Sequence, residues 1–143
     1  MRFLNRFYSD HPVLVAAFVV MLGVTLVALL LPAPELLRLK LWVVRWWPWM
    51  LDLSRANDAP GADKWVHGGL FAVLGLLGAL AWRGMRARPA LLLGLVVLGA
   101  LTEWLQAYVP GRSMSAADWV ADSAGALLGL GLGWLWARQL NKP

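Results

Sequence analysis

The sequence contains no cysteine and few charged residues. Without cysteine the chain has no disulfide framework, no thiolate metal site and no thiol nucleophile. Charged residues make up 15% of the 143 residues, against about a quarter in an ordinary soluble domain. Hydrophobic residues account for 60%. This composition excludes an ordinary soluble domain and indicates an integral membrane protein.

The sequence also lacks a continuous basic stripe and the common cofactor motifs. The net charge is +5, but the arginines are dispersed among apolar runs, so we expect no nucleic-acid partner. A glycine-rich phosphate loop and a dinucleotide fingerprint are both missing, and no cofactor is predicted. The basic residues are better explained as anchors at the cytoplasmic side of a membrane.

Four apolar segments are long enough to cross a bilayer. The first, 13–31, is followed by Pro-Ala-Pro-Glu, whereas a signal peptide would have a shorter apolar region and a small-residue cleavage site. The other spans are predicted at about 65–82, 90–107 and 116–137. Ser115 can cap the last of them. The predicted fold class is all-α, a single membrane domain over residues 1–143 that forms a bundle of four transmembrane helices.

A tryptophan-rich segment, residues 41–53, lies between the first and second spans. It is too short to span and is interrupted by Arg45 and Pro48, so we predict a short interfacial helix at the rim of the bundle. Membrane anchoring is the favoured role, because tryptophan prefers the headgroup layer. The alternative is an indole platform on which a sugar or lipid stacks.

Polar residues of the last three spans are expected to meet at one face of the membrane. Short connections make neighbouring spans antiparallel, so the starts of the second and fourth spans lie beside the end of the third. Ionisable residues near the centre of a span cost about 2.5–3.5 kcal/mol and usually face a protein interior or a cavity. The predicted polar cavity is formed by Asp63, Lys64, His67, Glu103, Gln106, Arg112, Asp118 and Asp122.

These residue types allow several kinds of chemistry. His67 and the carboxylates can act as general acid and base, and Arg112 with Lys64 can hold a phosphate. We expect Arg112 to reach Glu103 across the turn at 110–111 and share one cavity with it. A structural network of buried ion pairs would use the same residues. No paired-histidine motif is present, so no metal site is predicted, although carboxylates alone can hold a divalent ion.

Small residues form a stripe on the fourth span. Gly125, Gly129 and Gly133 recur at intervals of four, and Asp122 stands three residues before the first of them. Such a stripe favours close helix packing, so Asp122 is expected to face protein. Glycine is also common in membrane helices in general. A packed stripe could face this chain, a second copy of it or another membrane protein.

Four short motifs occur in a fixed order: DKWVH (63–67), TEWLQ (102–106), PGRSMS (110–115) and DWVAD (118–122), followed by a glycine-alanine run. Over about residues 60–137 the chain thereby resembles the VanZ-like family of small bacterial membrane proteins, named for a teicoplanin-resistance accessory protein. The family pattern commonly has asparagine at the position of Asp122. The resemblance implies a cell-envelope role and, in some members, lowered sensitivity to lipoglycopeptide antibiotics, with no agreed reaction.

Three functional hypotheses follow. The favoured one is a non-enzymatic protein of the bacterial cytoplasmic membrane that binds an anionic lipid or lipid-linked wall precursor through the polar cavity and alters antibiotic sensitivity. The second is a lipid-phosphate-processing enzyme that uses His67 with Glu103, Asp118 or Asp122. The third is a structural or transport partner subunit that packs through the glycine stripe.

Basic residues predict that both termini are cytoplasmic. In that orientation the cytoplasmic side carries seven lysines and arginines and the outer side six, so the number alone decides little. Three of the seven lie within the short connection at 83–89, and seven of the eight acidic residues then lie in the outer half.

We therefore expect reporters fused at residue 86 and at the C-terminus to read cytoplasmic, and a reporter at residue 58 to read extracytoplasmic. Paired phosphatase and fluorescent-protein fusions measure this. The reverse pattern would overturn the orientation and leave the shared polar face untouched.

Overall fold

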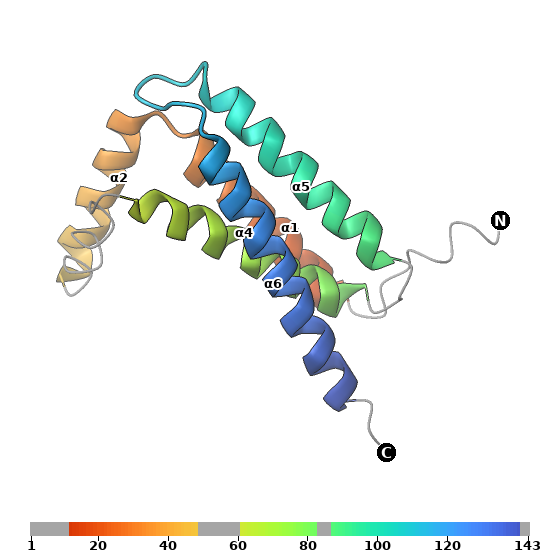
Figure 1. Cartoon of the computed structure of the whole chain (residues 1–143). Helices are drawn as coiled ribbons and strands as arrows, with labels where there is room; N and C mark the ends of the chain where they lie inside the picture. The colour runs from red at the N-terminus through yellow and green to blue at the C-terminus, as the bar shows by residue number, and fades with distance from the viewer. Residues whose placement is uncertain (1–11, 49–60, 83–86, 141–143) are drawn as a thin grey trace.

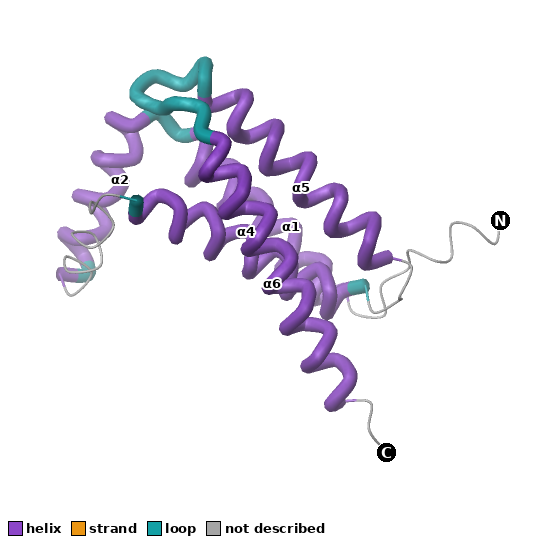
Figure 2. Tube along the Cα trace, in the orientation of Figure 1, coloured by secondary structure: helices purple, strands orange, loops and turns teal. Residues whose placement is uncertain are grey.

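The computed structural model describes residues 12–48, 61–82 and 87–140 (Figure 1). The structure in these ranges is helical, with short connecting loops between the described helices (Figure 2). This confirms the all-α fold class. The helices are α1 (Pro12–Leu30), α2 (Ala33–Trp46), α4 (Ala62–Ala81), α5 (Ala87–Gln106) and α6 (Ala116–Leu140).

Four of the described helices, α1, α4, α5 and α6, are long and apolar enough to cross a membrane. Each lies where a span was predicted, with bounds that differ by three residues or fewer. The starts of α4 and α5 differ most from the prediction, and each lies three residues earlier. At the start of α4 the earlier beginning places Asp63 in the first turn. An acidic side chain is favourable there because it interacts with the positive end of the helix dipole.

The interfacial helix differs from its predicted position. It was expected at 41–53, but α2 begins at Ala33 and ends at Trp46, and residues 49–53 lie outside the described part of the chain. Pro34 explains the early start, because proline is tolerated in the first helical turn, where its missing N–H has no partner to lose. With 14 residues and none of them buried, α2 is too short to span a bilayer.

The helices alternate in direction along the bundle. Helices α4 and α6 run parallel and pack most closely, α5 lies antiparallel along α6, and α1 packs on α4 (Figure 1). The ring of Phe18 in α1 meets the ring of Trp82 edge-on, with centroids 5.2 Å apart. This order places the start of α4, the end of α5 and the start of α6 at one end of the bundle.

The glycine stripe of α6 faces α4 of the same chain. A Cβ added at Gly125 would collide with the backbone carbonyl of Gly68, and one added at Gly129 would collide with that of Ala72. The two backbones are therefore in direct contact, which only glycine permits here. Because α4 covers the stripe, that surface is not available to a separate membrane-protein partner.

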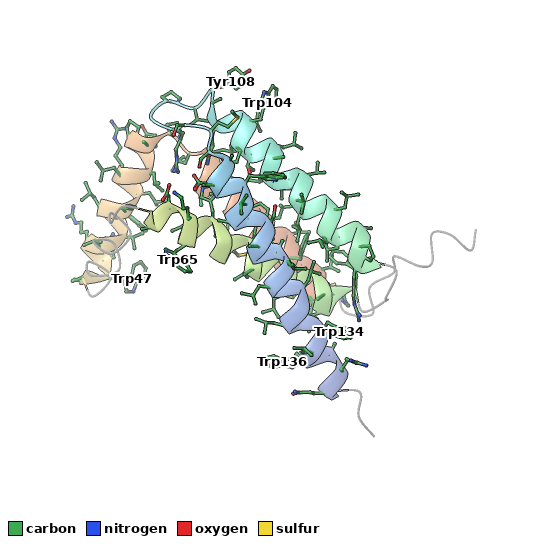
Figure 3. All side chains as sticks on the ribbon, viewed as in Figure 1. Trp47, Trp65, Trp104, Tyr108, Trp134 and Trp136 are labelled. Atoms are coloured by element: carbon green, nitrogen blue, oxygen red, sulfur yellow. The ribbon has the colours of Figure 1, made fainter. Side chains whose placement is uncertain are left out.

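Aromatic side chains mark the two ends of the bundle (Figure 3). The labelled residues near the α5–α6 turn or the first turn of α4 are Trp65, Trp104 and Tyr108, and those near the end of α6 are Trp134 and Trp136. All but Trp134 are exposed. Belts of exposed tryptophan and tyrosine at both ends are typical of the two membrane–water interfaces.

Replacing Gly129 with leucine should destabilise the bundle, because the side chain has to push α4 away from α6. Overpacking of this kind costs about 1–3 kcal/mol of free energy of unfolding, and more where backbone is in the way. The matched control is Gly131→Leu, since a Cβ at Gly131 meets nothing within 4 Å. Thermal unfolding in detergent and in lipid measures both. Equal melting temperatures for the two variants would contradict the packing.

Candidate functional site

Four ionisable residues are buried together at the end of the bundle where α4, α5 and α6 meet. They are exposed by no more than 5% of their surface, and the other buried residues described are mostly apolar. We call them the buried cluster: His67 from α4, Glu103 from α5, and Asp118 and Asp122 from α6. Charged groups are almost never buried unless they are paired or bind an ion, so contacts within the cluster have to compensate for the burial of these groups.

His67 is the centre of the buried cluster. Its Nδ1 lies 3.1 Å from Asp122 Oδ1 and 3.5 Å from Glu103 Oε1. When Nδ1 carries the proton, it donates to Asp122, which fixes the ring orientation and leaves the Nε2 lone pair for a proton or a ligand. A histidine held in this way can act as a base or as a ligand.

Glu103 connects α5 to the beginning of α6. Its Oε2 accepts a hydrogen bond of 2.7 Å from the backbone N–H of Ser115. The Ser115 hydroxyl in turn accepts a hydrogen bond of 3.2 Å from the backbone N–H of Asp118, which is the cap expected from the sequence. Glu103 therefore has one oxygen committed to the backbone and the other, Oε1, directed toward His67.

The buried cluster contains more negative than positive charge. Glu103 Oε1, Asp118 Oδ1 and Asp122 Oδ2 are buried and have no hydrogen-bond partner. Lys64 approaches Asp118 Oδ1 to 3.6 Å, but it is partly exposed and lies 3.5 Å from Asp63 as well. Three carboxylates thus face one shared lysine and one histidine.

Gln106 and Arg112, also predicted in the polar cavity, bind the end of α1. Gln106 Nε2 donates to Leu29 O at 2.9 Å. Arg112 donates to Ala28 O at 2.8 Å and to Leu31 O at 3.4 Å. The last carbonyls of a helix have no partner within the helix, so these donors satisfy them and hold α1 against the α5–α6 turn.

The expected pairing of Arg112 with Glu103 is not what the structure shows. The Arg112 guanidinium donates to the α1 carbonyls, and Glu103 accepts from Ser115 instead. His67 lies beside Glu103 and lines a pocket with Arg112. Sequence spacing could not reveal this, because the free carbonyls that attract Arg112 lie about eighty residues earlier in the chain.

A pocket of about 220 Å³ reaches His67 between α1, α2, α4 and the α5–α6 turn. We call it the basic pocket, and it is lined by Ala28, Leu29, Leu36, Lys40, Asp63, Val66, His67 and Arg112. Lys40 was not predicted as a site residue. It reaches the pocket because α2 turns from the end of α1 toward the start of α4, and nothing in the sequence signals that turn beyond the amphipathic pattern of the helix.

A second, larger hollow runs between α4 and α6. This apolar groove has a volume of about 510 Å³ and is lined mainly by small residues, with Lys64 and Trp65 at the end near the first turn of α4. Its lining residues are Gly61, Lys64, Trp65, Gly68, Gly69, Ala72, Ala121, Ala124, Gly125 and Leu128. The basic pocket and the apolar groove therefore lie on two sides of the same helix turn.

The eight residues of the predicted polar cavity thus fall into two groups. His67, Glu103, Asp118 and Asp122 form the buried cluster, with Lys64 at its edge. The remaining three, Asp63, Gln106 and Arg112, line the basic pocket or cap α1. One ligand atom each from His67, Glu103 and Asp118 lie within 4.8 Å of one another, although these residues come from three helices and form no sequence motif.

Comparison with known protein families places the chain in one of them. The family model VanZ/LLP1 matches residues 14–137. The match is wider than the 60–137 region of the motifs, because it includes the first span and α2. Comparison with curated proteins gave no match, and neither did comparison with solved structures. A match that runs from α1 almost to the end of α6 shows that the chain belongs to the VanZ/LLP1 family.

Proposed function

We propose that the protein binds the phosphate of an anionic lipid or of a lipid-linked cell-wall precursor in the basic pocket. The observation that carries the proposal is the lining of that pocket, which combines Arg112 and Lys40 with His67. Arginine offers a planar set of donors that suits phosphate oxygens, and lysine adds a point charge. The pocket includes Arg112 of the α5–α6 turn, and Trp104 and Tyr108 lie beside that turn (Figure 3), at the level where lipid head groups reside.

The apolar groove supports the same proposal from the other side of α4. A hydrocarbon chain needs a long apolar surface, and the groove supplies one beside the first turn of α4. Lys64 stands at that turn, so a chain in the groove would bring its head group to the polar end of the bundle. Ligand sites typically combine such apolar walls with a few placed polar groups.

The proposed setting is the cytoplasmic membrane of a bacterium, with the polar end of the bundle at the outer leaflet. A protein that holds a lipid-linked wall precursor there changes how much of it is accessible to glycopeptide antibiotics. Lowered sensitivity to teicoplanin is the effect that follows. Membrane lipids are the proposed partners, and self-association through surfaces other than the glycine stripe is compatible with this role.

The second candidate function is a lipid-phosphate-processing enzyme. It is favoured by one observation, the contact between His67 Nδ1 and Asp122 Oδ1, which is the arrangement that orients a catalytic histidine. His67 also lines the basic pocket, so a phosphate held by Arg112 would lie next to a potential acid or base. Binding and catalysis therefore share one site and differ in whether the ligand is changed.

Gently purified protein should carry a phosphate-bearing lipid enriched above its level in the membrane extract. Arg112→Lys and Lys40→Gln should each lower the retained amount several-fold, because phosphate coordination depends on the fork of arginine and on the second charge. Quantitative mass spectrometry of co-purified lipid measures this. The matched control is Arg38→Gln, since Arg38 lies on the same helix as Lys40 but does not line the basic pocket and forms an exposed ion pair with Glu35.

Folding has to be recorded on the same preparations, because Arg112 also caps α1. Melting temperature and monodispersity measure folding. Lys40→Gln leaves the hydrogen bonds of Arg112 to the end of α1 in place. Parental lipid retention in folded Arg112→Lys and Lys40→Gln protein would refute the proposed site. Teicoplanin sensitivity of a strain that expresses each variant should follow lipid retention.

The binding proposal also predicts that the protein does not hydrolyse the lipid that it binds. In vesicles that contain a polyprenyl phosphate or diphosphate, wild-type protein should release no more inorganic phosphate than folded His67→Gln protein does. A colorimetric phosphate assay over several hours measures this. Multiple turnovers by the wild type that His67→Gln abolishes would replace binding with the enzymatic candidate.

A further inference from the structure

We propose that the buried cluster binds a divalent metal cation, with His67, Glu103 and Asp118 as ligands. This goes beyond lipid binding and does not depend on it. It also departs from the expectation drawn from sequence motifs, which indicated no metal site. The reason for the departure is that each ligand comes from a different helix, so that only the packed bundle assembles the set.

The distances between the ligand atoms suit a single ion. One atom from each of the three residues lies within 4.8 Å of the others, and His67 Nδ1 is 3.5 Å from Glu103 Oε1. Ligand atoms bonded at about 2.1 Å to a tetrahedral ion are about 3.4 Å apart. Small side-chain rotations therefore bring the group to bonding distance without any movement of the helices.

The buried carboxylate oxygens that accept no hydrogen bond are a second indication. Glu103 Oε1 and Asp118 Oδ1 have no hydrogen-bond partner, although their residues are only 3% and 5% exposed. A buried carboxylate oxygen without a partner is costly, and proteins usually satisfy it with a donor or a metal ion. Both oxygens belong to residues of the group that would surround the ion.

Charge balance supports a cation of charge two. Glu103, Asp118 and Asp122 bring three carboxylates to the buried cluster, and the facing basic groups are His67 and the partly exposed Lys64. A divalent ion would neutralise the excess. Because Asp122 Oδ1 lies 3.1 Å from the same Nδ1, Asp122 would stand beside the ion as a further carboxylate.

The ligand types indicate the class of ion, and the basic pocket gives it a path. One imidazole nitrogen with carboxylate oxygens suits Mn²⁺ or Zn²⁺, because imidazole favours transition metals and carboxylate favours harder ions. His67 lines the basic pocket, so an ion can reach the cluster without passing through the apolar core.

Mn²⁺ is the probe for the test, because electron paramagnetic resonance distinguishes bound from free Mn²⁺. Full-length protein in detergent, first treated with a chelator and kept free of added lipid, should bind one Mn²⁺ per chain saturably and gain thermal stability. Glu103→Gln and Asp118→Asn should each weaken binding at least tenfold. Glu35→Gln is the matched control, since Glu35 is an exposed carboxylate on α2 paired with Arg38.

Two results would overturn the metal site: folded wild-type protein without saturable Mn²⁺ uptake, or Glu103→Gln and Asp118→Asn protein that binds as the wild type does. Glu103→Gln alters the contact with Ser115, so Asp118→Asn decides the matter if the former does not fold. Arg112→Lys should keep Mn²⁺ affinity while losing lipid. Failure of the lipid site and failure of the metal site are thereby distinguishable.

Discussion

The backbone contact between α4 and α6 is the constraint on which the rest of this structure depends. Gly68 and Gly125 touch through their backbones, and that contact sets the distance and the register of the two helices. His67 precedes Gly68, and Asp122 lies three residues before Gly125, so the same contact brings imidazole and carboxylate to 3.1 Å. In a membrane, where apolar surface gives little drive for association, such close packing is a main source of helix affinity.

Polar side chains at this end of the bundle are buried in a largely apolar protein, and they find partners in two different ways. Gln106 and Arg112 use free carbonyls at the end of α1, and thereby attach the first span to the last two. The carboxylates instead gather around His67, where some of their oxygens remain without donors. The donors of Gln106 and Arg112 thus have acceptors within the chain, whereas the carboxylates around His67 still have oxygens that can accept a ligand.

The basic pocket, the apolar groove and the buried cluster meet at the first two turns of α4. Asp63 and His67 face the pocket, Lys64 stands at the groove, and His67 also belongs to the cluster. A phosphate in the pocket and a cation in the cluster would therefore be neighbours, as in many phosphate sites where a metal ion supplies part of the positive charge. In the proposals above, lipid binding and metal binding would be coupled through these two turns.

The sequence by itself determined the four spans, the cap at Ser115 and the end of the bundle at which the polar residues gather, because hydrophobic length and alternation of antiparallel helices are local properties. The tertiary structure decided which polar groups touch. Arg112 was expected beside Glu103 but binds Ala28 and Leu31, since the free carbonyls of α1 lie far away in sequence and only packing brings them near. Lys40 enters the site for the same reason, because α2 turns toward the start of α4.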